Sequence, residues 1–435
     1  MPPHRRLLVI LDGLADRPGP EGSTPTPLEA ASTPNLDRLL REGTVGQATI
    51  IGPGIAPESD AGVLSLLGYD PVRDSPGRGV LEALGAGLPL GPGDVALRMN
   101  FATADAGGAI RDSRVGRDLS TAEASALAAS LTGADLLGPL GIRAEVRATV
   151  GHRGVLWLHP TGDAALSPEV SNSDPFYERQ GGMGHARATT DSRPRPVRPL
   201  DSSPEARRTA EAVNHFLVAA GPILAGDPVN LRRARAGAKV GNALLLRNAG
   251  RLPSRPPEPF ATRYGAAGTA VTEMPVERGI ARLFGLSDRY VGPMGPDRNG
   301  SLEERARVTR AALRDSPFVY VHLKGPDEPG HDGEWDRKRE IIEDLDRSYF
   351  GPFLSGQSAD SVRLAVTADH ATPVTRRGHS DDPVPLLYWG AGVRASGRPA
   401  KFCERVCAGG ALGLRRAAEV LPLLFSPGPV PPADP

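Results

Sequence analysis

The sequence predicts an α/β protein whose main domain is a doubly wound, largely parallel sheet, interrupted by a smaller inserted domain of α/β or α+β type. Three observations lead to this prediction. Short apolar runs without polar alternation end in polar clusters, as expected for strands buried on both faces of a sheet. In the last third of the chain, such runs alternate with a helical pattern. The middle of the chain has a different texture and proline-rich joints.

The first predicted element is a buried strand at Leu7–Leu11, a continuous apolar run. Asp12 follows it and therefore lies at the carboxyl end of the strand, where open α/β sheets bind ligands. A helix is predicted next. Thr33 is a suitable N-cap, Pro34 fits the first helical position, and Gly43 ends the apolar pattern.

A second, short helix is predicted to begin at Ser59. Apolar residues recur through positions 63–67, and Gly68 stops the pattern. The backbone N–H groups of the first helical turn would then point toward Ser59.

Further strands are predicted in the last third of the chain, at Phe318–Leu323, Val362–Thr367 and Val384–Tyr388. Each is an apolar run that ends in a polar or glycine-containing cluster. Between the first two, an amphipathic pattern from Ile341 to Tyr349 predicts a helix, so the order is strand, helix, strand.

We therefore expect residues 1–74 and 271–425 to form one discontinuous domain and residues 75–270 to form the insert. Proline-rich linkers at Arg193–Pro199 and Arg251–Pro259 support an inserted domain. The segment 426–435 is rich in proline and is expected to be disordered.

Composition and charge exclude several classes of protein. The chain has 435 residues, 39% of them hydrophobic, which suffices for the cores of two or three domains. Lys plus Arg equals Asp plus Glu at 51 each, so no global field attracts nucleic acid or an anionic membrane. No apolar run resembles a signal peptide or approaches the roughly 20 residues of a membrane span, so we expect a cytoplasmic protein. The two cysteines, Cys403 and Cys407, lie in one predicted helix, which excludes a disulfide scaffold.

The strongest functional signal is a set of acidic residues and histidines near predicted strand ends. Asp327 and His331 follow one strand, Asp369 and His370 follow the next, and His379 lies nine residues further on. Taken singly, each is more often a surface or capping residue. Gathered at one sheet edge, they would form an uncompensated charge cluster that needs cations. Imidazole and carboxylate ligands suit Zn²⁺ or Mn²⁺, and the excess of oxygen donors favours Mn²⁺ or Mg²⁺.

Together with Asp12 and Ser59, these residues exceed the ligands that one ion requires. We therefore expect two divalent ions, Mn²⁺ first with Zn²⁺, Co²⁺ and Mg²⁺ as alternatives, arranged as in two-metal phosphoryl transfer. Metal coordination lowers the pKa of a serine hydroxyl and makes it nucleophilic. Ser59 is thus the candidate nucleophile, although its position also fits a serine that only caps a helix.

Four groups of residues follow one another along the chain: Ile10–Gly13, Pro57–Asp60 with Leu66–Pro71, Arg111–Arg117, and the C-terminal Asp and His motifs. Together they resemble the archaeal-type cofactor-independent (2,3-bisphosphoglycerate-independent) phosphoglycerate mutases of the alkaline phosphatase superfamily. The resemblance covers nearly the whole chain.

The resemblance implies an alkaline-phosphatase-like domain split by an inserted transferase domain. It also implies a mutase that interconverts 3-phosphoglycerate and 2-phosphoglycerate through a phosphoserine, with a small phosphorylated hydroxyacid as its partner. It implies two metal sites, one formed by Asp12, Ser59, Asp369 and His370 and the other by Asp327, His331 and His379.

The insert carries candidate substrate-binding cations. Arg111, Arg114 and Arg117 offer guanidinium forks for a carboxylate or phosphate. Asp112 between them is a candidate acid–base group for the glycerate hydroxyls. On composition alone, with 51 basic residues in the chain, three neighbouring arginines also fit a solvated face. The resemblance favours binding and adds three matching positions: His152, Arg153 and the catalytic Lys324.

Three positions depart from the family pattern. Glu58 precedes the nucleophile where glycine is usual, Phe176 stands where relatives tend to have histidine, and Asn248 replaces a usual glycine. A carboxylate beside a phosphoryl group repels it, so the departures leave the substrate more open than the reaction class. The alternatives are a paralogue acting on another phospho- or phosphono-hydroxyacid, a phosphohydrolase, and a non-enzymatic metal-binding module. The oligomeric state is not predicted.

Overall fold

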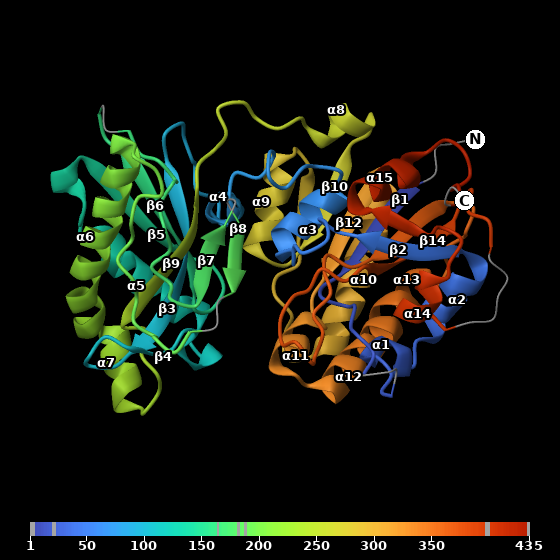
Figure 1. Ribbon diagram of the computed structural model, residues 1–435, viewed down its shortest axis with the longest axis horizontal. Coiled ribbons are helices and arrows are strands. Elements are labelled where there is room, and N and C mark those ends of the chain that lie inside the picture. Colours follow the sequence, from blue (N-terminus) through green and yellow to red (C-terminus); the bar gives the residue numbers. More distant parts are fainter. Residues whose placement is uncertain are drawn as a thin grey trace. The chain divides into compact units, whose positions relative to one another are not determined.

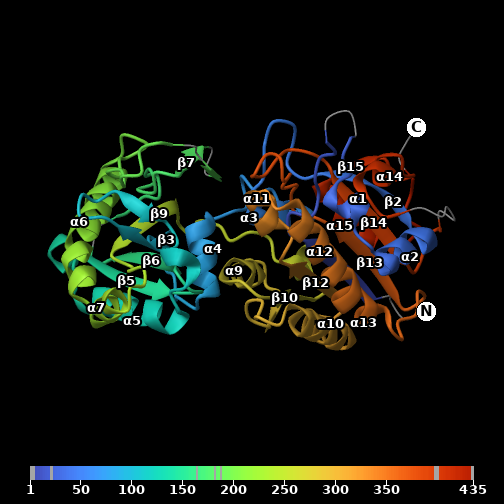
Figure 2. The same cartoon turned by 90° about the horizontal axis from the view of Figure 1, so that it is seen from below.

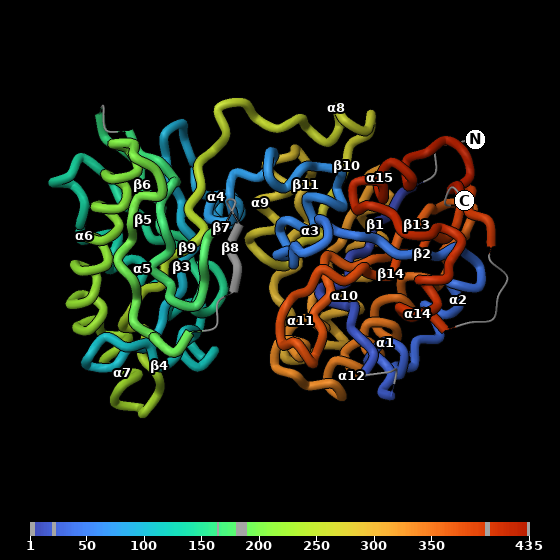
Figure 3. The backbone as a smooth tube through the Cα atoms, viewed as in Figure 1, coloured from blue at the N-terminus to red at the C-terminus, as the bar shows by residue number. Residues whose placement is uncertain are grey.

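The computed structural model describes residues 5–19, 23–162, 165–180, 183–186, 189–395 and 401–432 (Figure 1). The chain divides into two compact units. Unit 1 comprises Met1–Ser75, Glu258–Glu273 and Phe284–Pro435, and unit 2 comprises Pro76–Pro257 and Met274–Leu283. The chain thus leaves unit 1 and returns to it, and both of its ends belong to unit 1 (Figure 3). The excursion of Met274–Leu283 into unit 2 has no counterpart in the boundaries expected from the sequence.

In the described residues, unit 1 is built on an eight-stranded sheet in the order β11-β10-β12-β1-β13-β14-β2-β15. The strands are β1 (Arg5–Leu11), β2 (Thr44–Thr49), β10 (Gly268–Thr272), β11 (Ser287–Tyr290), β12 (Phe318–Leu323), β13 (Val362–Thr367), β14 (Val384–Gly390) and β15 (Leu414–Arg416). Strand β1 lies between β12 and β13 and runs parallel to both, so Val9 is level with Val321 and Val366. The predicted strands at these three places are confirmed, and all three are fully buried apart from the start of β1.

Strand β14 runs antiparallel to β13. Its end at Gly390 therefore lies at the sheet edge opposite the ends of β1, β12 and β13, and its start lies at the same edge as those ends. The apolar run at Val384–Tyr388 predicts a buried strand but carries no information about direction. Because of this direction, His379, which precedes β14, reaches the edge where the other candidate ligands gather.

Helices cover both faces of this sheet (Figure 2). On one face, α10 (Arg298–Asp315), α12 (Trp335–Leu345) and α13 (Gly351–Leu354) pack around a π-helical turn at Asp346–Phe350. On the other face, α3 (Ser59–Leu66) and α15 (Ala417–Phe425) pack against each other. The remaining helices of unit 1 are α1 (Pro27–Ala30), α2 (Pro34–Glu42), α8 (Phe260–Tyr264), α11 (Asp327–Asp332) and α14 (Glu404–Ala408).

The predicted helix at Pro34 is α2, but its cap differs from the expectation. Thr33 occupies the N-cap position, yet its side chain makes no capping hydrogen bond. The carboxylate of Asp346 instead accepts the backbone N–H of Asn35 at 3.1 Å and of Leu36 at 2.8 Å. A carboxylate from another helix thus satisfies the free N–H groups, which no local pattern reveals.

Unit 2 contains an antiparallel sheet centred on β3 (Val95–Ala104), which pairs with β6 (Arg153–Pro160), with β9 (Ala243–Gly250) and, near its end, with β4 (Ile110–Asp112). The other strands are β5 (Ile142–Ala148), which pairs with β6, and the ribbon β7 (Tyr177–Gln180) with β8 (Met183–Ala186). The helices are α4 (Arg78–Gly85), α5 (Thr121–Gly133), α6 (Pro204–Gly226), α7 (Pro228–Arg235) and α9 (Pro275–Leu283).

The two faces of β3 have different surroundings. Val95, Leu97, Met99 and Phe101 join the large core formed with α5 and α6. Ala96 packs on the opposite face against α4, and the next two side chains at alternate positions, Arg98 and Asn100, are polar.

Residues 426–432, for which the sequence predicts disorder, pack against the rest of unit 1. Arg363 donates to the carbonyl oxygens of Ser426 at 2.7 Å and Gly428 at 3.1 Å, and Val430 is buried. Residues 433–435 lie outside the described part. Of the helices in the described ranges, none combines the length and apolar character that crossing a bilayer requires.

Candidate active site

The candidate active site of unit 1 lies at the sheet edge where β1, β12 and β13 end. Asp12 directly follows β1, Asp369 follows β13, and Asp327 begins α11 shortly after β12. Ser59 is the first residue of α3, and His379 comes from the segment before β14. All seven predicted metal ligands gather here: Asp12, Ser59, Asp327, His331, Asp369, His370 and His379.

Two glycines allow these segments to approach one another. A Cβ atom on Gly13, whose φ is 63°, would lie 2.8 Å from the Asp327 Cα atom. A Cβ atom on Gly62, within α3, would lie 2.3 Å from the Asp369 carbonyl oxygen. Cβ atoms are essentially never found within 3.0 Å of another heavy atom. Only glycine therefore lets α3 lie against the segment that follows β13 and present Ser59 to it.

The first ligand group contains Asp12, Asp369 and His370, whose ligand atoms all lie within 4.8 Å of one another. All three side chains are buried. The Ser59 hydroxyl joins them, with its Oγ atom 3.2 Å from His370 Nε2 and 3.5 Å from Asp12 Oδ1. The serine hydroxyl is thus held against a carboxylate and an imidazole at the start of a helix.

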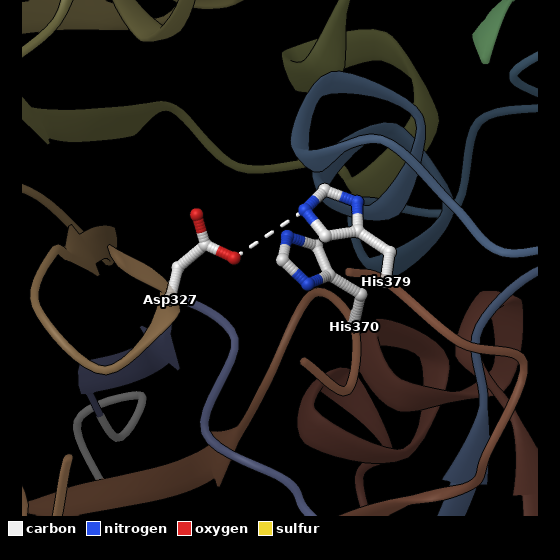
Figure 4. Close-up of side chains that lie close together, drawn as sticks. All are labelled: Asp327, His370 and His379. Atoms are coloured by element: carbon white, nitrogen blue, oxygen red, sulfur yellow. Dashed lines mark ion pairs between the residues drawn. The ribbon is translucent and has the colours of Figure 1, made fainter. Parts of the chain in front are cut away.

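The second ligand group contains Asp327, His370 and His379, again within 4.8 Å (Figure 4). The Oδ1 atom of Asp327 lies 3.3 Å from His379 Nε2 and 3.4 Å from His331 Nε2. The Nε2 atoms of His331 and His379 are 3.1 Å apart. His370 belongs to both groups, whereas the family resemblance assigns it to the first group alone.

The three histidines are oriented by contacts of their Nδ1 atoms. These contacts join His370 to the Thr372 hydroxyl at 3.0 Å, His379 to the Pro57 carbonyl at 2.8 Å and His331 to the Arg377 carbonyl at 3.3 Å. A carbonyl oxygen only accepts, so Nδ1 of His331 and of His379 carries the proton. Their Nε2 atoms then face the cluster. Outer contacts of this kind orient metal-binding histidines.

Carboxylates and cationic side chains shift each other's pKa values in this cluster. Burial alone would raise the pKa of Asp12, but the Lys324 ammonium and two neighbouring histidines hold it well below its usual range. Burial would lower the pKa of His379, but the hydrogen bond and charge of Asp327 raise it to about 10. Burial and the charge of Asp12 would raise the pKa of Asp327, but His379 and His370 lower it overall, so both carboxylates are ionised at neutral pH.

The hydrogen bonds around Asp369 indicate whether a cation fits this cluster. Its side chain is fully buried, and its Oδ1 atom accepts the Gly13 N–H at 3.1 Å. Among the described residues, its Oδ2 atom accepts no well-formed hydrogen bond, although His322 Nε2 lies 3.2 Å away. A buried carboxylate oxygen without a well-formed hydrogen bond is costly, and so is the approach of the His331 and His379 Nε2 atoms to 3.1 Å. Divalent cations would satisfy both, so the residues present fit a metal site.

Lys324 and His322 flank Asp12 on β12 and its end. The Lys324 ammonium lies 3.3 Å from Asp12 Oδ2, which places the predicted catalytic lysine in the cluster. His322 is buried, and its Nε2 atom lies 3.7 Å from Asp12 Oδ1. Sequence reasoning missed His322. The available signal is its position two residues before Lys324, which places both side chains on one face of the strand.

A buried network supports the loops that carry these ligands. Lys338 of α12 and Asp16 are both fully buried, and Lys338 Nζ lies 2.9 Å from Asp16 Oδ2. The same ammonium donates to the Thr372 carbonyl at 2.8 Å, and the Thr372 hydroxyl donates to Asp327 Oδ1 at 2.8 Å. Glu404 of α14 accepts the Asp16 N–H at 3.0 Å. Through these hydrogen bonds, helices α12 and α14 hold the loops that follow β1 and β13 in place.

A second set of candidate residues lies on the α4 face of the unit 2 sheet. Arg98 in β3 is directly opposite Arg247 in β9, and Asn100 is directly opposite Arg153 in β6. Directly opposite residues share a face, and so do residues two apart in one strand. The four side chains are therefore neighbours. Like charges in direct opposition destabilise a sheet unless counter-charges hold them.

Two buried carboxylates supply part of that counter-charge. Glu82 Oε1 of α4 accepts a hydrogen bond from Arg78 Nε at 3.1 Å and lies 3.3 Å from Arg98 Nε. Asp174 Oδ2 accepts one from Arg247 Nη1 at 3.1 Å. Burial and the Arg78 charge lower the pKa of Arg98 to about 9. Positive charge thus exceeds negative charge on this face, which suits a bound oxyanion.

His152 and its neighbours extend this cationic face. Burial, together with the charges of Arg153 and Arg114, lowers the pKa of His152 to about 3, so its ring is neutral at physiological pH. Arg117 adds to the same shift. The structure therefore brings four predicted substrate-binding residues together: Arg114, Arg117, His152 and Arg153.

Arg111 does not join this group. Its side chain is 70% exposed and pairs with Asp105 at 2.7 Å. The neighbouring Asp112 lies closer, with its Oδ1 atom accepting the Arg114 N–H at 2.8 Å and its Oδ2 atom 2.6 Å from Lys239 Nζ. Burial acts to raise the pKa of Asp112, but the hydrogen bond from Lys239 and those from the backbone lower it overall.

The three departures from the family pattern lie in different surroundings. Glu58 is the N-cap residue of α3, and its charge helps to raise the pKa of His379. Phe176 packs against the small apolar cluster of Ala102, Ile110 and Leu245. Asn248 has a φ of 52°, a left-handed conformation that asparagine tolerates better than most residues other than glycine.

The comparisons with known proteins agree with one another. The family model described as 2,3-bisphosphoglycerate-independent phosphoglycerate mutase matches residues 41–230. A protein of that name from Aeropyrum pernix is 44% identical over 410 residues, which cover 94% of this chain and 95% of the relative. This chain belongs to the 2,3-bisphosphoglycerate-independent phosphoglycerate mutase family. The resemblance of the motifs to this family is thereby confirmed.

Other members and solved structures extend the similarity to this phosphoglycerate mutase family. A relative of the same name from Methanopyrus kandleri is 41% identical and covers 90% of this chain and 89% of its own length. The cofactor-independent phosphoglycerate mutase from Thermoplasma acidophilum is 32% identical, with a TM-score of 0.60 and coverage of 97% and 99%. A protein from Pyrococcus horikoshii is 30% identical, with a TM-score of 0.75 and coverage of 97% and 96%.

Four supporting residues escaped the sequence reasoning: Glu82, Arg98, Asn100 and Lys239. Two more were given no site role, because the sequence favours a structural role for Arg247 and the stretch around Arg78 is too short for a phosphate loop. For Arg98 a signal existed, because a charged residue inside an apolar run is costly to bury without a purpose. For Glu82 and Lys239 the sequence carries no such signal. Their roles depend on partners that are distant along the chain.

Proposed function

We propose that this chain is a metal-dependent phosphoglycerate mutase that interconverts 3-phosphoglycerate and 2-phosphoglycerate, with Ser59 carrying the phosphoryl group. Family membership supports the reaction. One observation carries the mechanism: the Ser59 hydroxyl, at the first position of α3, lies 3.2 Å from His370 Nε2 within a buried group of carboxylates and imidazoles. Unit 1 would be the alkaline-phosphatase-like domain, and unit 2 the inserted transferase domain.

The residues that would hold two divalent ions are Asp12, Ser59, Asp369 and His370 on one side and Asp327, His331 and His379 on the other, with His370 in reach of both. We propose Mn²⁺, because carboxylate and hydroxyl oxygens are numerous among these ligands and thiolates are lacking. When bound, such ions would lower the pKa of the serine hydroxyl and neutralise charge on the phosphoryl group.

The chain's own residues account for the group transfer. Ser59 Oγ loses its proton and attacks the phosphorus atom, the ester bond to one glycerate oxygen breaks, and that oxygen takes up a proton. The other glycerate oxygen then loses its proton and attacks the same phosphorus atom. The bond from phosphorus to Ser59 Oγ breaks, and Ser59 Oγ takes up a proton. The N–H groups at the start of α3 and the Lys324 ammonium provide positive potential for the transferred group. No atom is gained or lost, so the overall reaction is an isomerisation.

The cationic face of unit 2 would bind the organic acid. Arg98 and Arg153 suit its carboxylate, and the ionised Asp112 suits a hydroxyl whose proton moves during the reaction. The excess of positive charge on this face supports an anionic substrate.

The test is an enolase-coupled assay of the purified protein with 3-phosphoglycerate and Mn²⁺. We expect activity that chelation abolishes and Mn²⁺ restores, and none in Ser59→Ala. The matched control is Ser203→Ala, because Ser203 also starts a helix and accepts the Ala206 N–H. Its loss should cost only about 1 kcal/mol of stability and leave turnover intact. Wild-type turnover in Ser59→Ala contradicts the serine mechanism, and release of inorganic phosphate without 2-phosphoglycerate favours a phosphohydrolase.

A further inference from the structure

The segment that carries Arg114 and Arg117 has a strained backbone. Three consecutive residues have positive φ angles: 51° at Val115, 67° at Gly116 and 60° at Arg117. Glycine adopts this conformation freely, but a β-branched valine strongly resists it. Such strain persists only where the surroundings hold it, and it concentrates at functional sites. Something in unit 2 must therefore hold this turn in place.

Part of the restraint comes from the core, because Val115 is fully buried in the core formed with α5 and α6. The other part comes from a lysine side chain. Lys239 crosses the turn, with its Cδ atom 3.3 Å from the position that a Cβ atom on Gly116 would occupy. Its ammonium then reaches Asp112 Oδ2 at 2.6 Å. The lysine thus contacts both the strained turn and the candidate acid–base group.

The backbone around Lys239 is itself firmly anchored. Arg233, which is buried, donates from Nε to the Lys239 carbonyl at 2.7 Å, and its other nitrogens bind Asp118 and Glu123. The next carbonyl, that of Val240, accepts from the Thr103 hydroxyl at 2.7 Å. These contacts fix where the lysine side chain starts. An exposed ion pair usually contributes little to stability. An ion pair whose lysine starts from a fixed backbone can nevertheless hold its partner in place.

We propose that Lys239 is a positioning residue of the mutase: it holds Asp112 and clamps the turn at residues 115–117, so that Asp112, Arg114 and Arg117 meet the substrate in one fixed arrangement. This inference rests on the function proposed above. It assigns a role to a residue outside the family motifs that the sequence analysis used. In this arrangement Asp112 remains ionised and accepts a hydrogen bond or proton from a glycerate hydroxyl.

The inference predicts a pH effect, because Lys239 stabilises the ionised form of Asp112. Among the described residues, Lys239 from the segment after α7 contacts the Asp112 carboxylate, and Arg111, Arg114 and Arg117 lie in the same segment as Asp112, with Arg111 engaged by Asp105. Removing the lysine charge raises the pKa of Asp112. The acid limb of the profile of kcat/KM should then move to higher pH.

The experiment compares Lys239→Met with Arg289→Met, in mutase assays over a range of pH. Arg289 is a matched control, since it is 54% exposed and pairs with Asp315 at 3.2 Å, while Lys239 is 55% exposed. We expect Lys239→Met to lower kcat/KM about tenfold, the usual effect of a lost charge-assisted hydrogen bond, and to shift the acid limb upward. Lys239→Arg should restore most of the loss. Arg289→Met should match the wild type in both respects.

Two further measurements separate positioning from general damage. In an Asp112→Asn background, Lys239→Met should cause little additional loss, because its partner is already gone. The affinity for 3-phosphoglycerate, measured by calorimetry and therefore independently of turnover, should fall with Lys239→Met. An unchanged pH profile and affinity in Lys239→Met overturn the inference, and so does an equal loss with and without Asp112. Lack of mutase activity in the wild type would instead refute the proposed function.

Discussion

Gly62→Ala should separate Ser59 from the candidate metal ligands. The added Cβ atom would lie 2.3 Å from the Asp369 carbonyl oxygen, where at least 3.0 Å is needed, so α3 or the segment after β13 must move by at least 3.0 − 2.3 = 0.7 Å. Alanine gains about 1 kcal/mol of helix propensity over glycine, but overpacking costs about 1–3 kcal/mol. We therefore expect a modest net loss of stability. Because Ser59 lies in the same helix, a displacement approaching 1 Å should lower kcat about 100-fold.

The assays are urea unfolding and the enolase-coupled mutase assay, both with Mn²⁺ present. The matched control is Gly133→Ala at the end of α5, where an added Cβ atom meets nothing within 4 Å. That variant should be as stable as the wild type or up to about 1 kcal/mol more stable, with unchanged kcat. Equal kcat in Gly62→Ala and the wild type, with no loss of stability, would refute the claim that this close approach positions Ser59.

Three further predictions concern buried charges. Lys338→Met leaves Asp16 as an uncompensated buried charge and should lower the free energy of unfolding by about 3–5 kcal/mol, measured by urea titration. A decrease of less than about 1 kcal/mol contradicts the network. Burial raises the pKa of Glu404 to about 7 from 4.5, so its contribution to the free energy of unfolding, present at pH 4.5, is lost as the pH rises through 7. Glu404→Gln should remove this decline of the free energy of unfolding between pH 5 and pH 8. The same decline in the variant and the wild type would count against a raised pKa of Glu404. Arg98→Met should raise KM about tenfold with kcat little changed, and an unchanged KM would remove Arg98 from the substrate site.

The sequence predicts the metal-ligand set because the relevant signals are local. Each of Asp12, Asp327 and Asp369 follows a buried apolar run, and parallel strands bring their carboxyl ends to one edge. The helix that begins at Ser59 is also visible in the apolar spacing. What escaped prediction depends on distant partners. Asp346, rather than Thr33, caps α2, and His370 lies in reach of both ligand groups.

The substrate side shows the limit more sharply. Arg111 is the first arginine of the motif, yet its side chain turns to Asp105. Arg98 and Arg247 lie 149 positions apart and become neighbours only through the pairing of β3 and β9. By itself, the sequence determined the family, the strand ends and the chemistry of the metal ligands, since these follow from residue type and local periodicity. Only the tertiary structure decided the direction of β14, the cationic face beside Glu82 and the clamp by Lys239. These depend on which distant segments pack together, and the same residues in another packing would form none of them.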